Sequence, residues 1–182
     1  AYFTKSPVVQ GAVIIAFIIQ WVLFLPAYFF QTEKFYDIVG SFTYITVVSY
    51  TFFSSHISSG FNIGNFIISF LIIVWALRLG SFLFLRICKE GEDKRFKFIK
   101  PSSTRFFMTW TLQGMWVSVC SLSALTAMSS PTGVVVNGML FIGISIFIFG
   151  LLLEIIADYK KTQFRNKPEN KGHFISSGLW AY

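Results

Sequence analysis

Residues 133–165 read GVVVNGMLFIGISIFIFGLLLEIIADYKKTQFR, an apolar run that ends in a crowded set of acids, bases and aromatic residues. A helix that crosses a membrane needs about 20 mostly apolar residues, and residues 133–157 supply them. Four similar runs lie upstream, at 8–30, 38–55, 66–85 and 106–128. The sequence therefore predicts an all-α bundle of about five transmembrane helices, followed by a polar tail over 158–182.

The composition agrees with this interpretation. Hydrophobic residues make up 54% of the 182 residues and charged residues only 13%, whereas a soluble domain carries about 25% charged residues. We therefore predict an integral membrane protein with a single membrane domain over residues 1–182. Cys88, Cys120, His56 and His173 are isolated from one another in the sequence, so the pattern indicates neither a disulfide framework nor a metal site.

The basic residues predict an orientation. With five spans, every Lys and Arg outside the spans except Lys5 falls on one side of the membrane. The positive-inside rule then places the N-terminus outside, with the basic loops and the C-terminal tail in the cytosol or an equivalent compartment. The formal net charge of +7 is explained by these loops, so we expect no nucleic acid partner. Anionic lipid headgroups are the expected partner of these basic loops, and a phosphate-bearing cofactor is the more specific alternative.

Arg78 is the most unusual residue within a predicted span. It lies about 12 Å inside the third span, at about 1.5 Å per residue, and a guanidinium there must be paired or must reach water. Glu154 and Asp158 are four residues apart near the end of the fifth span, so they share one helical face. These charges indicate either a salt-bridge patch between the third and fifth spans or a ligand site.

The loop after the first span, residues 32–37 (TEKFYD), combines two carboxyl groups with a tyrosine. Such a set can deliver a proton to a substrate if it faces a cavity, and the alternative is a solvated turn. Within the fourth span, Gln113 is expected to bond to another helix or to a ligand, and Gly114 permits close packing.

Five groups of residues, in order along the chain, resemble the steroid 5α-reductase superfamily. The similarity is greatest to its branch of seven-span membrane proteins of unassigned substrate. The groups are 32–37 with Gly40, Ser41, Thr43 and Tyr44; 78–83 (RLGSFL) with Arg86; 91–96 (GEDKRF); 110–114 (WTLQG); and 154–180.

The resemblance implies an all-helical membrane reductase that uses NADPH to reduce a carbon–carbon double bond conjugated to a carbonyl, in a sterol or another lipid. Asp158 and Arg165 match the family's Asp and Arg that hold the cofactor, Glu154 matches a further polar contact, and the loop ending near Arg95 is placed to reach the phosphates. The family's substrate-side Glu has its nearest equivalent in Glu33. Its catalytic Tyr has no counterpart, and that region offers Arg78, so Glu33 and Arg78 are the predicted catalytic residues.

Members of the superfamily continue beyond the equivalent of residues 178–182 with a further polar segment and two more spans. If the chain is complete, we expect much of the dinucleotide pocket to be absent and the protein to be inactive. The alternative hypothesis is a non-catalytic subunit of a larger membrane complex derived from this family. The predicted location is the endoplasmic reticulum, an organellar membrane or a bacterial inner membrane.

Overall fold

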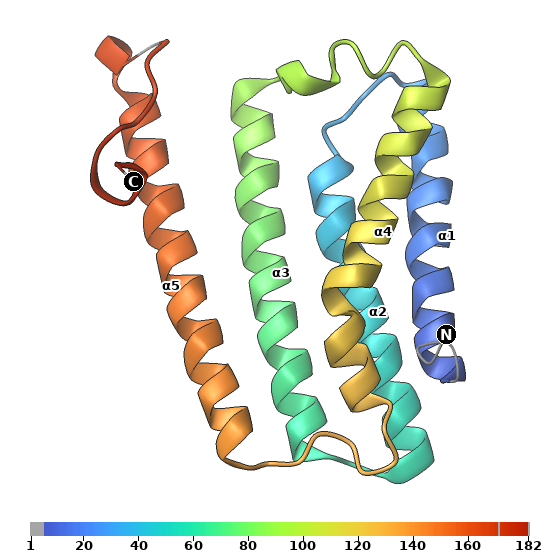
Figure 1. Ribbon diagram of the computed structural model, residues 1–182. Helices are drawn as coiled ribbons and strands as arrows, with labels where there is room; N and C mark the ends of the chain where they lie inside the picture. Colours follow the sequence, from blue (N-terminus) through green and yellow to red (C-terminus); the bar gives the residue numbers. More distant parts are fainter. Residues whose placement is uncertain (1–5, 171, 182) are drawn as a thin grey trace. The chain divides into compact units, whose positions relative to one another are not determined.

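The structure is a computed structural model that describes residues 6–170 and 172–181, apart from the side chain of Lys94. Figure 1 shows long helices throughout the described chain, so the predicted all-α class is confirmed. The helices are α1 (Pro7–Phe29), α2 (Tyr36–Ser59), α3 (Ile63–Glu90), α4 (Ser103–Met128) and α5 (Gly138–Asn166). The described residues also form the short 3₁₀ turns η2 (Lys94–Phe96), η3 (Pro168–Asn170) and η4 (Gly178–Trp180).

Four of the helices, α1, α2, α3 and α5, are long and apolar enough to cross a membrane, which indicates an integral membrane protein. The fourth predicted span does form a helix of 26 residues, α4. Its composition is less apolar than the sequence analysis assumed, because α4 carries polar residues along its length, among them Thr109, Gln113, Ser118 and Ser121. Length and composition thus support four spanning helices where five were predicted.

The fifth span was predicted to start at about residue 133, and α5 begins five residues later, at Gly138. Gly133 has φ +62 and lies in the preceding loop. The helix begins after Asn137, whose side chain accepts a hydrogen bond from the Leu140 amide and so satisfies one free donor of the first turn. At its other end α5 continues to Asn166 through polar residues, since leaving an apolar environment does not by itself end a helix.

The chain divides into two compact units, Ala1–Val135 and Val136–Tyr182, called unit 1 and unit 2 below. In unit 1, α1, α2 and α4 pack against one another, and α3 packs against α2 (Figure 1). Small residues allow this close packing. A Cβ atom on Gly80 of α3 would lie 2.5 Å from Ser41 Oγ of α2, and Ala12, Ala16 and Ala76 are fully buried.

Asn65 organises the end of unit 1 at which α2 joins α3. This residue is 1% exposed. Its Nδ2 donates to Ser55 Oγ at 2.9 Å and to the Met128 carbonyl at 3.1 Å, while its Oδ1 accepts from the Val134 amide at 2.9 Å. All of its polar atoms are therefore satisfied inside the protein, and they join α2, α3 and the end of α4.

Candidate functional site

The opposite end of unit 1 carries a set of paired charges where the α1–α2 loop meets the α3–α4 loop. We call it the ionic cluster, and its members are Glu33, Asp37, Arg86, Asp93, Arg95 and Lys100. Glu33 lies at its centre and is 5% exposed. Lys100 Nζ donates to Glu33 Oε2 at 2.6 Å, and the Asp93 amide donates to Glu33 Oε1 at 3.0 Å. Both carboxylate oxygens of Glu33 thus accept a hydrogen bond from the α3–α4 loop, so Glu33 connects this loop to the α1–α2 loop.

These contacts determine the charge of Glu33. Burial acts to raise the pKa of its carboxyl group, but the hydrogen bonds from Lys100 and from the Asp93 amide outweigh burial, so the pKa lies below its usual range. Glu33 is therefore an anion at neutral pH. In this arrangement it acts as the counter-ion of Lys100, and the catalytic role suggested by the family resemblance stays a prediction.

Asp93 and Arg95 form the second pair of the ionic cluster. The Arg95 guanidinium donates to both oxygens of Asp93, with Nη2 at 2.6 Å from Oδ2, and the Arg95 amide donates to Oδ1 at 2.9 Å. The hydrogen bond from Arg95 lowers the pKa of Asp93, and the same bond raises the pKa of Arg95. Arg95 was predicted to reach a cofactor phosphate, and it would have to leave Asp93 to do so.

Aromatic side chains pack beneath the ionic cluster. The ring of Tyr36 meets Phe96 and Trp110 edge to face, with centroids 5.0 and 5.4 Å apart, and its hydroxyl donates to the Thr109 carbonyl at 3.1 Å. Gln113 Nε2 donates to the Tyr36 carbonyl at 3.1 Å, which confirms the predicted bond from Gln113 to another helix. The cluster therefore rests on a packed contact between α2 and α4.

Acid should weaken unit 1 through these carboxylates. The pKa values of Glu33 and Asp93 are lower in the folded protein than in the unfolded chain. The ionised carboxylates therefore stabilise the folded state fully above the pKa values of the unfolded chain. This stabilisation is lost as the pH falls through the pKa values of the folded protein. We expect the apparent Tm in detergent to fall below about pH 4. The Glu33→Gln variant should show a smaller fall between pH 6 and pH 3. An identical pH profile for that variant would contradict the role given to Glu33.

The other predicted catalytic residue, Arg78, lies elsewhere. Its guanidinium carbon is 5.5 Å from the centroid of the Phe82 ring, one turn further along α3. It is about 12 Å along α3 from Arg86 of the ionic cluster, at about 1.5 Å per residue. Along the axis of α3, Arg78 therefore lies about two helical turns from the ionic cluster.

Unit 2 contains the other predicted site residues, Glu154, Asp158 and Arg165, all on α5. In this unit the chain after α5 folds back along the helix. Trp180 Nε1 donates to the Ala157 carbonyl at 3.4 Å, and Lys161 Nζ lies 4.8 Å from the centroid of the Trp180 ring. The returning chain and α5 line an open pocket of about 230 Å³.

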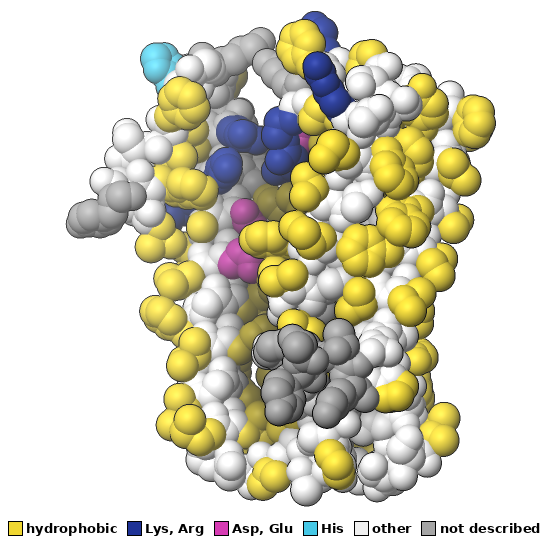
Figure 2. Space-filling view, turned by 45° about the vertical axis from the view of Figure 1, so that its right-hand side comes forward, with side chains coloured by type: hydrophobic (Ala, Val, Ile, Leu, Met, Phe, Trp, Pro, Cys, Tyr) yellow, Lys and Arg dark blue, Asp and Glu magenta, His cyan; other side chains and the backbone are white. Residues whose placement is uncertain are grey.

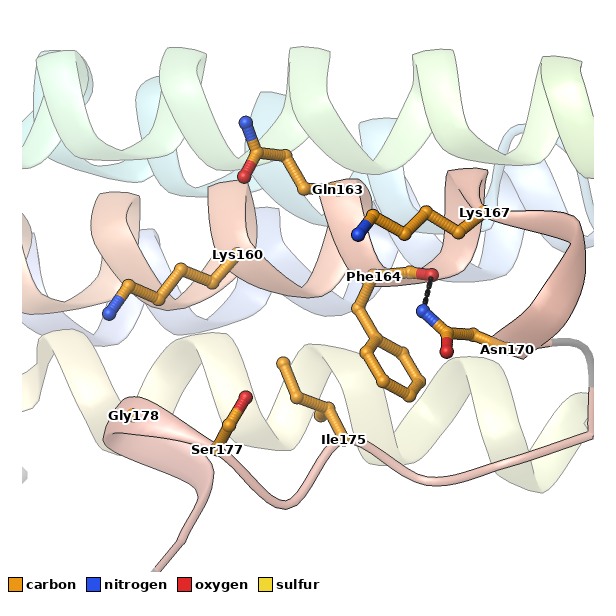
Figure 3. A pocket seen from close by; sticks show the side chains of 8 residues that line it. All are labelled: Lys160, Gln163, Phe164, Lys167, Asn170, Ile175, Ser177 and Gly178. Atoms are coloured by element: carbon orange, nitrogen blue, oxygen red, sulfur yellow. Dashed lines mark hydrogen bonds between the residues drawn. The ribbon is translucent and has the colours of Figure 1, made fainter.

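Figure 3 shows the side chains that line this pocket. They are Lys160, Gln163, Phe164, Lys167, Asn170, Ile175, Ser177 and Gly178. Asn170 Nδ2 donates to the Phe164 carbonyl at 2.9 Å, and the Phe164 ring points toward Ile175. None of the three predicted cofactor residues on α5 is among the lining residues.

The lining residues were not among the predicted site residues, although the sequence carries a signal for them. Lys160 and Lys167 were used only as evidence for orientation. They are seven residues apart, so they lie near one face of α5. Gly178, with φ +63, lies beside Lys160. A helix with lysines at this spacing, followed by a returning Gly-containing segment, suggests an anion-binding pocket.

The search of curated proteins and the search of solved structures each found no match to this chain. The family model described as "Protein of unknown function (DUF1295)" matches residues 9–182. This family is related to the steroid 5α-reductases. The match covers α1 through η4 and therefore both units. The chain belongs to the DUF1295 family.

Proposed function

We propose that this chain is an NADPH-dependent membrane reductase that acts on a carbon–carbon double bond conjugated to a carbonyl in a sterol or another lipid. The observation that carries the proposal is the pocket of unit 2. It lies within residues 154–180, the segment that resembles the cofactor-binding part of the steroid 5α-reductases. The class of substrate rests on the family relationship.

The lining residues of the pocket suit a phosphorylated dinucleotide. Lys160 and Lys167 are cations of the kind that phosphate groups require. Gln163, Asn170 and Ser177 add side-chain donors and acceptors that match ribose hydroxyls and amides. The donor set therefore fits one phosphate-bearing end of NADPH.

Gly178 contributes to the same pocket. A Cβ atom at this position would lie 2.9 Å from Lys160 Nζ, and its φ of +63 disfavours other residues. Glycine thus allows the lysine ammonium group to approach the backbone of the returning segment. The volume of about 230 Å³ is below the roughly 300–1,000 Å³ of pockets that enclose a whole ligand, so we expect the pocket to hold only part of the cofactor.

NADPH, when bound, supplies the hydride for the reduction. The residues of unit 2 would bind and orient its charged end. In unit 1, Glu33 is held as an anion by Lys100 and so is placed to keep the two loops in position. Glu154, Asp158 and Arg165 are proposed as further cofactor contacts, on the strength of the family motif alone.

A binding titration tests this proposal without requiring turnover. We expect the purified chain in detergent to enhance NADPH fluorescence in a saturable manner. The double variant Lys160→Met, Lys167→Met should raise Kd at least tenfold, because a hydrogen bond to a charged group contributes about 1.5–3 kcal/mol. The matched control is Arg105→Met, which removes an exposed positive charge from α4 and should leave Kd unchanged.

Two results would overturn the proposal. One is the absence of NADPH binding by a folded wild-type chain, and the other is an equal Kd for the double lysine variant. The first result would favour the alternative, a non-catalytic subunit of a membrane complex.

A further inference from the structure

Exposed aromatic and basic side chains surround the ionic cluster at its end of unit 1. We call them the aromatic rim, and they are Phe29, Phe30, Lys34, Phe35, Lys97 and Phe98. Phe29 and Phe30 are each 79% exposed and Phe98 is 76% exposed. In Figure 2, hydrophobic and basic side chains lie side by side at the upper end of the view, the end at which Figure 1 places the α1–α2 and α3–α4 loops.

The two halves of the rim are held together by Glu33. Lys34 and Phe35 follow Glu33 directly in the α1–α2 loop, whereas Lys97 and Phe98 lie between Asp93 and Lys100 in the α3–α4 loop. Because Glu33 accepts hydrogen bonds from both the Asp93 amide and Lys100, these residues belong to one surface.

The ionic cluster also determines which charges the rim presents outward. Glu33 is paired with Lys100, Asp93 with Arg95, and Asp37 with Arg86 at 3.8 Å. Among the residues that the structure describes, the exposed side chains of Lys34 and Lys97 take part in no ion pair. Lys100 also lies 3.9 Å from the exposed Glu92. Across residues 32–37 and 86–105, eight Lys and Arg stand against five Asp and Glu, so this end of unit 1 carries a net positive charge to which Lys34 and Lys97 contribute.

The rim lies where two candidate membrane spans end. α1 ends at Phe29 and α3 ends at Glu90, and both are long and apolar enough to cross a membrane. Aromatic and basic side chains at the end of a span are typical of the headgroup region. The anionic lipids of a leaflet attract each nearby Lys or Arg with about 1 kcal/mol.

We propose that the aromatic rim is a binding surface for anionic lipid headgroups, with Lys34 and Lys97 binding the lipid phosphates and Phe30 and Phe98 inserted beside the acyl chains. This role is independent of the NADPH pocket, because every residue of the rim belongs to unit 1. It also distinguishes the lysines that bind lipid from the partly buried Lys100, whose ammonium group is engaged by Glu33.

Lipid retention tests the proposal. The full chain is assembled in nanodiscs of phosphatidylcholine with one-fifth phosphatidylglycerol, transferred to a neutral detergent, and analysed by mass spectrometry for lipids that remain bound. We expect phosphatidylglycerol to be enriched over its share of the nanodisc. The double variant Lys34→Gln, Lys97→Gln should lower this enrichment by up to about 30-fold, the factor that corresponds to roughly 2 kcal/mol.

Two further variants make the result specific. Lys34→Arg with Lys97→Arg keeps the charges and should retain the enrichment. Phe30→Ala with Phe98→Ala should reduce the retention of both lipids while the preference for phosphatidylglycerol persists. The proposal is overturned if the Gln variant, shown to be folded by its circular dichroism, retains the wild-type preference. It is equally overturned if the wild-type chain retains both lipids in the ratio of the nanodisc.

Discussion

Replacing Lys100 by methionine is expected to destabilise unit 1 by about 3 kcal/mol. The change leaves Glu33 in a site where the residue is 5% exposed, and removes the cation that pairs with its carboxylate. Removing one partner of a buried ion pair typically costs about 3–5 kcal/mol. The lower end applies here, because the side chain of Lys100 is 16% exposed and water can reach the vacated position. The free energy of unfolding, measured in a neutral detergent, checks the value.

Two control variants separate this effect from the loss of a positive charge. Lys97→Met removes an exposed lysine three residues away and should change the free energy of unfolding by less than about 0.5 kcal/mol. The double variant Glu33→Gln, Lys100→Met removes both charges and should recover most of the lost stability. If Lys100→Met and Lys97→Met have equal effects, the buried pair does not hold the two loops together.

Replacing Gly64 by alanine should destabilise unit 1 by about 2 kcal/mol. A Cβ atom on Gly64 would collide with the carbonyl oxygen of Val134. That backbone cannot easily move, because the Val134 amide donates to the buried Oδ1 of Asn65. Overpacking costs about 1–3 kcal/mol, and the upper value applies against a fixed backbone. Alanine favours the helix over glycine by only about 1 kcal/mol. The collision costs more than this, so the variant is destabilised.

The matched control for this variant is Gly143→Ala in α5. Within unit 2 a Cβ atom at Gly143 meets nothing within 4 Å. The only expected effect is therefore the better helix propensity of alanine, and the variant should be as stable as the wild-type protein or slightly more stable. Thermal unfolding of both variants in the same detergent gives the comparison. A Gly64→Ala variant as stable as the wild-type protein would show that the chain at Val134 can move aside.

Hydrophobic run length predicted the helices well, because a spanning helix must satisfy its backbone hydrogen bonds internally and so requires a long apolar segment. Each of the five predicted runs overlaps one helix. Helix ends were less predictable, since they depend on local caps such as Asn137 and on the turn at Gly133. The apolarity of α4 was overestimated because its polar residues are diluted among aromatic ones.

The candidate sites were only partly predictable. Charge and family motif predicted a catalytic role for Glu33 and a cofactor contact for Arg95, and the structure brings these two residues into one cluster through Asp93. Their bonding partners could not be foreseen, since Lys100 is 67 residues from Glu33 in the sequence. The pocket of unit 2 was missed because it requires the chain after α5 to fold back along the helix.

The sequence by itself determined the class of this protein. Composition and run length favour apolar helices, because five apolar runs of about 20 residues match the length of helices that satisfy their own backbone hydrogen bonds in a membrane. Only the tertiary structure decided which charged side chains pair with one another and which face outward without an ion-pair partner among the described residues. Ion pairing depends on distances of a few ångströms between residues far apart in the chain, and these distances neutralise Lys100, Arg95 and Arg86 while Lys34 and Lys97 remain exposed.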